Sequence, residues 1–158
     1  MHVHTAQVSW RRGSAPFTDG KYARAHTWRF DGGVEVLASA SPQRVPVPMS
    51  LEAAVDPEEA LVAAVSSCHL LWFLYFASKA GLCVDGYDDD AVGELARDER
   101  GKTWLSTFIL RPRVTWSGVA PTAEVEAALH HQAHEACDIA NSLRGTVRVE
   151  PRCATGER

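Results

Sequence analysis

The stretch DPEEALVAAVSSCHLLWFLYFASKAG, from Asp56 to Gly81, decides how this chain folds. Asp56 is a preferred helix N-cap, Pro57 suits the first helical position, and Glu58 suits the positive end of the helix dipole. Gly81 is a typical helix stop. We therefore predict one long apolar helix with Cys68 near its middle.

The same stretch raises the question of membrane insertion. Residues 60–77 carry no formal charge, and about 18 apolar residues are the lower limit for a membrane span. However, Ser66, Ser67, Cys68 and His69 occupy its midpoint, where bilayer hydrocarbon is least tolerant of polar groups. We predict a helix covered by a sheet or by a partner subunit, and no membrane association.

Composition sets the broad class of the protein. The chain has 158 residues, 46% of them hydrophobic, which is enough for one domain with its own core. Its 20 acidic and 16 basic residues leave a net charge of −4, so no basic surface indicates nucleic-acid binding. The first residues, MHVHTAQVSW, lack the pattern of a secretory signal, and we expect a cytoplasmic protein.

The order of the predicted elements indicates a single α+β domain over residues 1–158. A second helix is expected from its cap at Thr122 to about Leu143, and Pro112 should bend the strand that contains it. The tail after about residue 150 should be loose. The predicted strands cover residues 3–10, 22–30, 34–40, 91–97, 103–116 and 146–149.

The four cysteines, Cys68, Cys83, Cys137 and Cys153, show no CxxC spacing. In a cytoplasmic protein they are expected to be reduced thiols. Cys68 lies on an apolar stripe of the first helix, where burial alone would raise the pKa of its thiol. To act as a nucleophile it would need a nearby cation. Cys83 and Cys153 are expected to be incidental.

Two segments carry a resemblance to a known family. DPEE at 56–59 leads through an alanine-rich stretch into SC at 67–68, and HEACDIAN follows at 134–141. This pattern resembles the OsmC/Ohr family of thiol-dependent organic hydroperoxide reductases. Asp138 after Cys137, where the family often has proline, and TDGKYARAH in place of a Gly-rich turn indicate a diverged member. The resemblance implies an OsmC-like fold, an antiparallel sheet with two long helices in an intertwined homodimer.

The resemblance also implies roles for individual residues. Cys68 corresponds to the cysteine that attacks an organic or fatty-acid hydroperoxide, and Cys137 to the cysteine that resolves it as an intrachain disulfide. Glu58 corresponds to the glutamate at the helix start, and Arg24 is nearest to the activating arginine, with Arg29 as the second choice. No bound cofactor is implied, but an external dithiol, such as a lipoyl-bearing protein, must reduce the disulfide.

Helix geometry adds an argument about assembly. Glu58 and Cys68 are ten residues apart, so a straight helix separates them by about 15 Å. If both serve one site, Glu58 must come from the other subunit, together with Arg24. We therefore predict an obligate dimer with composite sites, in which the two long helices pack antiparallel about a twofold axis.

Two other functions remain open from the sequence. His130, His134 and Cys137 are spaced i, i+4 and i+7 with His131 beside them, and they could bind zinc with one further ligand. A solvated helix face, or a proton relay through His134, would explain the same histidines. Alternatively, the protein is a non-catalytic module whose apolar cavity holds a lipid-like or aromatic ligand while the thiols stay passive.

Overall fold

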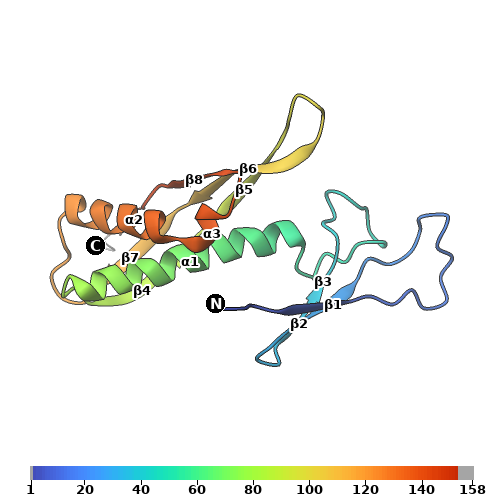
Figure 1. The fold of residues 1–158 in the computed structure, drawn as a ribbon, viewed down its shortest axis with the longest axis horizontal. Helices are drawn as coiled ribbons and strands as arrows, with labels where there is room; N and C mark the ends of the chain where they lie inside the picture. Colours follow the sequence, from blue (N-terminus) through green and yellow to red (C-terminus); the bar gives the residue numbers. More distant parts are fainter. Residues whose placement is uncertain (1, 153–158) are drawn as a thin grey trace, which may run out of the picture. The chain divides into compact units, whose positions relative to one another are not determined.

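The structure is a computed structural model that describes residues 2–152 (Figure 1). The chain divides into two compact units, Met1–Ala60 and Leu61–Arg158, which are described one at a time. Helices and strands occur together, as the predicted α+β class requires. The single domain over residues 1–158 stays a prediction.

The first unit is built on a three-stranded antiparallel sheet of β1 (Ala6–Ser9), β2 (His26–Phe30) and β3 (Glu35–Ala38), in the order β1-β2-β3. The prediction that one strand covers residues 22–30 is wrong in its first part, because β2 begins at His26. The preceding loop is closed on itself by Trp10, whose indole N–H donates to the carbonyl of Ala23 over 2.8 Å. Arg24 therefore lies in this loop, just before the strand.

Helix α1 (Pro57–Lys79) matches the predicted long helix closely. Asp56 and Glu59 cap its start reciprocally: the Glu59 N–H donates to Asp56 Oδ1 over 2.8 Å, and the Asp56 N–H donates to Glu59 Oε2 over 3.2 Å. At its end Gly81 has a φ of +73°, and the N–H of Leu82 reaches back to the Ala77 carbonyl over 3.0 Å. This left-handed stop is the conformation that glycine adopts without strain.

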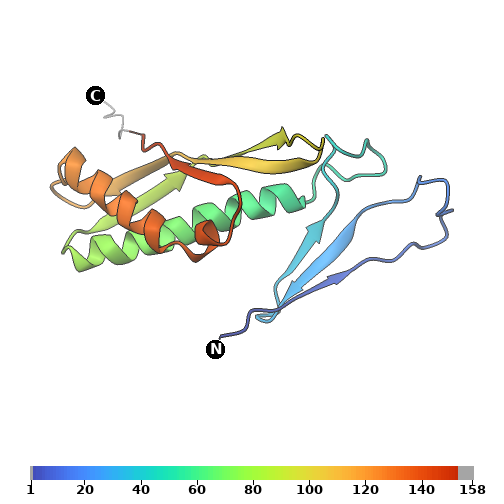
Figure 2. The ribbon, with the colours of Figure 1, turned by 45° about the horizontal axis from the view of Figure 1, so that its top comes forward.

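The second unit contains two sheets. β4 (Val84–Asp89) pairs antiparallel with β7 (Pro112–Trp116), and β5 (Val92–Arg97) pairs antiparallel with β6 (Thr103–Leu110). β8 (Thr146–Val149) runs parallel to β6 (Figure 2). The break predicted near Pro112 is present, since β6 ends at Leu110 and β7 begins at Pro112. β4 was not predicted, because its aspartates are unfavourable in strands.

The second helix is shorter than predicted. Thr122 is its N-cap, as expected, and Oγ1 accepts the N–H of Val125 over 3.4 Å. However, α2 (Ala123–Ala136) stops before Cys137, whose φ and ψ of −70° and 105° are extended. A short helix, α3 (Asp138–Asn141), follows. The prediction of one helix to about Leu143 is therefore wrong, because Cys137 ends one helix and caps the next.

One stripe of α1 holds the second unit together. Val65, His69, Phe73 and Ala77, at a spacing of four residues, are its buried positions. Phe73 and Ala77 pack in a core cluster with residues of β7 and α2, and Val65 packs in a second cluster with Phe108 and Leu110 of β6. Figure 1 and Figure 2 both show α1 and α2 side by side. Burial of each large side chain contributes roughly 1.5–3 kcal/mol.

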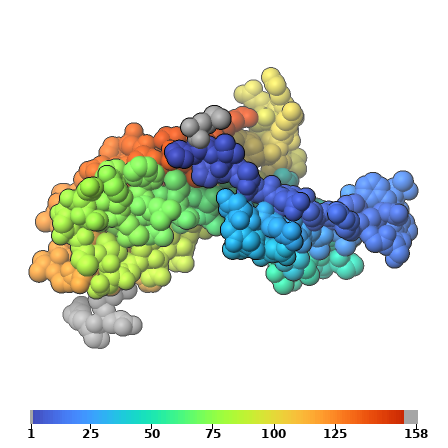
Figure 3. Space-filling view, turned by 60° about the horizontal axis from the view of Figure 1, so that its bottom comes forward, coloured from blue at the N-terminus to red at the C-terminus, as the bar shows by residue number. Residues whose placement is uncertain are grey.

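The opposite face of α1 is apolar and open. Leu71 is 64% exposed and Tyr75 is 49% exposed, with Leu74 between them also exposed. Figure 3 shows α1, in green, over a large part of one face of this unit. By length and composition α1 is apolar enough to cross a membrane, with a mean hydropathy of 1.8. Core helices of soluble proteins pass the same test, and α1 has the position of a core helix.

Two histidines form the polar contact of the α1–α2 interface. His69 Nε2 and His130 Nδ1 are 3.0 Å apart, and each histidine is almost fully buried. The two rings are stacked, and His130 also stacks on Phe73 with centroids 4.3 Å apart. One of these two nitrogens must donate and the other accept, which a pair of neutral rings can do. The pKa of each is lowered to about 4, by burial for His130 and by burial and then the neighbouring His130 and His134 for His69.

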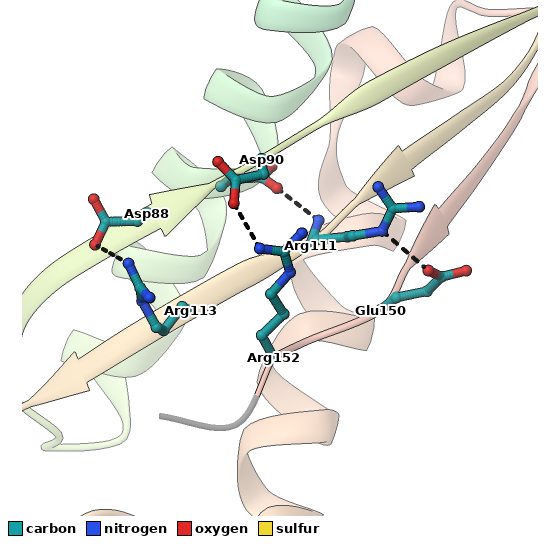
Figure 4. Close-up of polar contacts among 7 residues, drawn as sticks. Asp88, Asp90, Arg111, Arg113, Glu150 and Arg152 are labelled. Atoms are coloured by element: carbon teal, nitrogen blue, oxygen red, sulfur yellow. Dashed lines mark hydrogen bonds and ion pairs between the residues drawn. The ribbon is translucent and has the colours of Figure 1, made fainter. Parts of the chain in front are cut away.

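Ion pairs hold the strand ends on the surface of this unit (Figure 4). Arg113 pairs with Asp88 over 3.6 Å between β7 and β4. Arg111 pairs with Glu150 over 3.5 Å, and Arg152 with Asp90 over 2.6 Å. Single exposed pairs contribute little, but these pairs together connect the segment after β8 to the sheets.

The Asp89 carboxylate, at the end of β4, connects helix α1 to the residue between β6 and β7. One carboxylate oxygen accepts the N–H of Arg111 over 2.6 Å, and the other accepts the hydroxyl of Ser66 on α1 over 2.5 Å. A loose tail was predicted after about residue 150, but residues 150 and 152 are hydrogen-bonded to the strands. The N–H groups of Glu150 and Arg152 donate to the carbonyls of Leu110 and Pro112, and the rest of the tail, residues 153–158 with Cys153, lies outside the described residues.

The histidine pair predicts an acid-sensitive fold. Both histidines have a pKa of about 4 in the folded protein, against about 6.5 in an unfolded chain. The unfolded state therefore binds more protons between these values, and stability is lost as the pH falls through this window. We expect the free energy of unfolding, from urea titrations, to drop by about 3 kcal/mol or more between pH 7 and pH 4.

The double variant His69→Leu/His130→Phe should lose much less of its free energy of unfolding over the same pH range. His131→Leu, at an exposed position of the same helix, is the control and should keep the full acid sensitivity. An unchanged pH dependence in the double variant would contradict the assignment.

Candidate functional site

Cys68 lies in the middle of α1, half-buried, one residue away from the buried stripe. Successive helix residues are rotated by about 100°, so Cys68 sits at the edge of the α1–α2 interface while His69 points into it. Leu71, Trp72 and Tyr75 follow Cys68 at three, four and seven residues, on the same face of the helix. The open apolar face of α1 therefore begins at this thiol.

Cys137 lies between α2 and α3 and is 1% exposed. Its Sγ accepts the N–H of Ala140 over 3.3 Å and so caps α3. The pKa of the Cys137 thiol is raised to about 11, by burial first and then by the neighbouring Cys68 thiol, against the lowering effect of the Ala140 amide. At neutral pH Cys137 is therefore a protonated thiol.

The structure brings together the two cysteines that the sequence singled out. The Cys68 side chain is hydrogen-bonded to Cys137 and raises the pKa of the Cys137 thiol, and both are free thiols in the described part of the chain. One is accessible from the surface and the other is enclosed. This arrangement can form a disulfide between neighbouring elements, with different roles for its two members. Their catalytic roles stay a prediction.

Arg24 lies in the first unit, in the loop before β2. Its backbone N–H donates to the Met49 carbonyl over 2.8 Å. Its guanidinium carbon lies 3.9 Å from the centre of the Tyr22 ring, and Nη1 donates to the Tyr22 carbonyl. No carboxylate among the described residues is within ion-pair distance of it. Arg24 is thus a positioned cation without an acidic partner among residues 2–152.

Glu58 and Arg29, the other charged residues considered for the site, have partners within the chain. Glu58 Oε1 lies 3.9 Å from Arg44 Nε, so within one chain it faces Arg44 rather than Arg24. Arg29, the second choice for the arginine, is bonded to Glu35, which lies directly opposite it in the β2–β3 pair. This cross-strand pair occupies Arg29 in the sheet. Arg24 therefore remains the better choice.

The zinc set that the sequence left open as an alternative, His130, His134 and Cys137, does not form in the described residues. His130 is bonded to His69, whereas Cys137 neighbours Cys68 and caps α3. Within residues 2–152 no three histidine, cysteine or acidic side chains are arranged to hold a metal ion. His130, His131 and His134 do line a small cavity of about 270 Å³ against β8.

Three features of the site were missed from the sequence. Arg44 lies in a proline-rich loop where nothing in the local pattern links it to Glu58. His69 was considered only as a polar residue at the midpoint of the apolar helix, although its four-residue spacing from Val65 and Phe73 indicates burial. The aromatic side chains Trp10 and Phe17 are separated by a Gly/Pro loop without periodicity, and only the folded loop brings them together.

The comparison with solved structures supports this fold. An OsmC-like protein of unknown function from Vibrio cholerae O1 biovar eltor is 52% identical, with a TM-score of 0.93 over 96% of this chain and 100% of that one. An organic hydroperoxide resistance protein from Elizabethkingia anophelis has a TM-score of 0.70 at 17% identity, covering 97% of this chain and 96% of that one.

A third structure, OhrB, an organic hydroperoxide resistance protein of Bacillus subtilis, has a TM-score of 0.66 at 21% identity and covers 94% of this chain and 97% of that one. At these lower identities the likeness shows the fold alone. A search among curated proteins found no match.

The family described as OsmC-like protein matches residues 50–152, which include Glu58, Cys68 and Cys137, whereas Arg24 lies before the matched segment. The expected fold and family are thereby confirmed. The chain belongs to the OsmC-like protein family.

Proposed function

We propose that this protein is a thiol peroxidase that reduces organic hydroperoxides with Cys68 and Cys137. The observation that carries the proposal is the pairing of an accessible thiol with a buried neighbour whose pKa is raised to about 11. The names of two structural relatives, organic hydroperoxide resistance proteins, favour the same chemistry.

The first step is attack of the Cys68 thiolate on the outer oxygen of the hydroperoxide. A sulfur–oxygen bond forms and the oxygen–oxygen bond breaks, so that the sulfur is oxidised by two electrons to sulfenic acid. The inner oxygen leaves as an alkoxide and takes a proton to become the alcohol. Because Cys137 is buried and protonated, it does not compete for the peroxide.

In the second step Cys137 attacks the oxidised Cys68 sulfur. The sulfur–sulfur bond forms, the sulfur–oxygen bond breaks, and the oxygen leaves as water with the proton of the Cys137 thiol. An external dithiol then reduces the disulfide by exchange. We propose no resident cofactor, and a lipoyl-bearing protein is the reductant that the family resemblance implies. A cytoplasmic location suits this supply of reductant.

Arg24 supplies the cation that the first step needs. A guanidinium stays protonated, stabilises a thiolate and donates to peroxide oxygens. We propose that Arg24 and Glu58 act on the Cys68 of a second copy, where Glu58 holds the guanidinium. The exposed apolar face of α1, which begins at Cys68 and includes Leu71 and Tyr75, supports a dimer that covers it.

If Cys68 attacks the peroxide and Cys137 forms the disulfide, serine variants of the two residues should stop the reaction at different steps. Cys68→Ser should abolish consumption of cumene hydroperoxide, since the attacking sulfur is gone. Cys137→Ser should still form a sulfenic acid, trapped by dimedone, but should stop after one turnover and over-oxidise. In the wild type, a thiol count after one equivalent of peroxide should fall by two thiols, which dihydrolipoamide restores.

Cys83→Ser is the matched control, because Cys83 is also a free thiol but is exposed outside the pair. Its peroxide consumption should equal that of the wild type. Unchanged peroxide turnover by Cys68→Ser would contradict the proposed peroxidase activity and favour a non-catalytic binding protein.

Composite sites predict complementation between two inactive variants. In a mixed dimer of Cys68→Ser and Arg24→Leu chains, one site has both defects and the other has none. Random exchange of subunits should therefore restore about a quarter of the wild-type activity per chain. Each variant alone should stay inactive, and both should elute as dimers in size-exclusion chromatography.

The control for complementation is a mixture of Cys68→Ser with the double variant Cys68→Ser/Arg24→Leu, which should stay inactive. A mixture of the single variants that exchanges subunits without any recovery would show that Arg24 and Cys68 act within one chain.

A further inference from the structure

The first unit contains a cavity of about 470 Å³ beside Arg24. This volume is in the range of small-molecule sites in proteins. All residues that line it belong to the first unit, and its walls are mostly apolar. Its most distinctive part is an aromatic wall formed by Trp10, Phe17 and Tyr22.

The three rings of this aromatic wall pack on one another. Phe17 and Tyr22 are stacked with centroids 4.6 Å apart, and Trp10 meets the edge of Tyr22 at 5.5 Å. Phe17 is 50% exposed, so its ring is accessible to a ligand. The indole N–H of Trp10 is bonded to Ala23, so the ring itself is held in place.

The polar groups of the cavity narrow the chemistry of its ligand. His26 uses both ring nitrogens: Nε2 accepts the Trp28 indole N–H over 2.9 Å, and Nδ1 donates to the Arg24 carbonyl over 2.8 Å. Ser39 is fully buried and accepts the Leu51 N–H over 3.0 Å. The ring nitrogens of His26 are therefore both occupied within the protein.

Arg24 is the charged side chain of the lining. A guanidinium has five N–H donors, and in Arg24 the Nη1 group donates to the Tyr22 carbonyl. The other donors have no acceptor among the described residues. Since a guanidinium can only donate, the polar end of the ligand must accept hydrogen bonds, as the oxygens of a hydroperoxide do.

We propose that this cavity selects hydroperoxides with an aromatic body, such as aryl-alkyl hydroperoxides, over linear alkyl ones. The aryl group packs on Trp10 and Phe17 while the peroxide oxygens accept from Arg24. Ring–ring contacts add to the burial of apolar area, and a rigid aryl group loses less conformational entropy on binding than a linear chain. This inference rests on the proposed function and names its substrate class.

The kinetic test compares cumene hydroperoxide with n-nonyl hydroperoxide, which has the same number of carbon atoms. The wild type should favour the aromatic substrate by about 5-fold or more in kcat/KM, as expected for one or two ring contacts. Phe17→Leu, which keeps an apolar side chain but removes the ring, should bring this ratio near one. Phe30→Leu is the matched control, since Phe30 is an exposed aromatic residue outside the cavity, and it should keep the ratio.

A binding test separates this inference from the proposed chemistry and needs no change in the cavity. In the full-length Cys68→Ser variant, ligand-observed NMR should show tighter binding of 2-phenyl-2-propanol than of 2-cyclohexyl-2-propanol. Equal affinities for the two alcohols, or equal kcat/KM values for the two peroxides, would overturn the aromatic selectivity while leaving the thiol peroxidase intact. Peroxide turnover by Cys68→Ser would instead overturn the proposed function, and the binding preference would still report on the cavity.

Discussion

The packing of one stripe of α1 is the constraint on which the second unit depends. Val65, His69, Phe73 and Ala77 can be buried together in only one rotation of the helix. That rotation places Cys68 at the edge of the interface, next to Cys137, and leaves Leu71 and Tyr75 exposed. The thiol pair and the open apolar face are thus two consequences of the same packing. A change that rotated α1 would separate the sulfur atoms and bury the wrong face.

Rotation alone does not set how far α1 slides along α2. The hydrogen bond between His69 Nε2 and His130 Nδ1 favours this register, because a shift along the helix would leave these two nitrogens buried without a partner. The contact between Ser66 and Asp89 acts in the same direction from the sheet side. Apolar side chains thus supply most of the stabilisation, whereas these polar contacts make the arrangement specific.

Much of this molecule could be predicted from local pattern. The capping residues Asp56 and Thr122 mark the helix starts, and β8 was predicted with its observed bounds, because these features depend on neighbours in sequence. β4 was missed, because its strand is stabilised by pairing with β7 rather than by its own aspartate-rich sequence. The end of α2 was also missed, because Cys137 leaves the helical conformation for contacts that no local pattern shows.

The sequence by itself determined the family, the two helices and the two cysteines, because caps, spacing and residue type depend only on residues that are close in sequence. Only the tertiary structure decided that the thiols are neighbours, that Cys137 is the enclosed one, and that His130 bonds to His69 rather than to a metal. It also decided that Arg24 faces an aromatic cavity. The physical reason is that burial and pKa depend on residues distant in sequence, which become neighbours only when the helices and sheets pack.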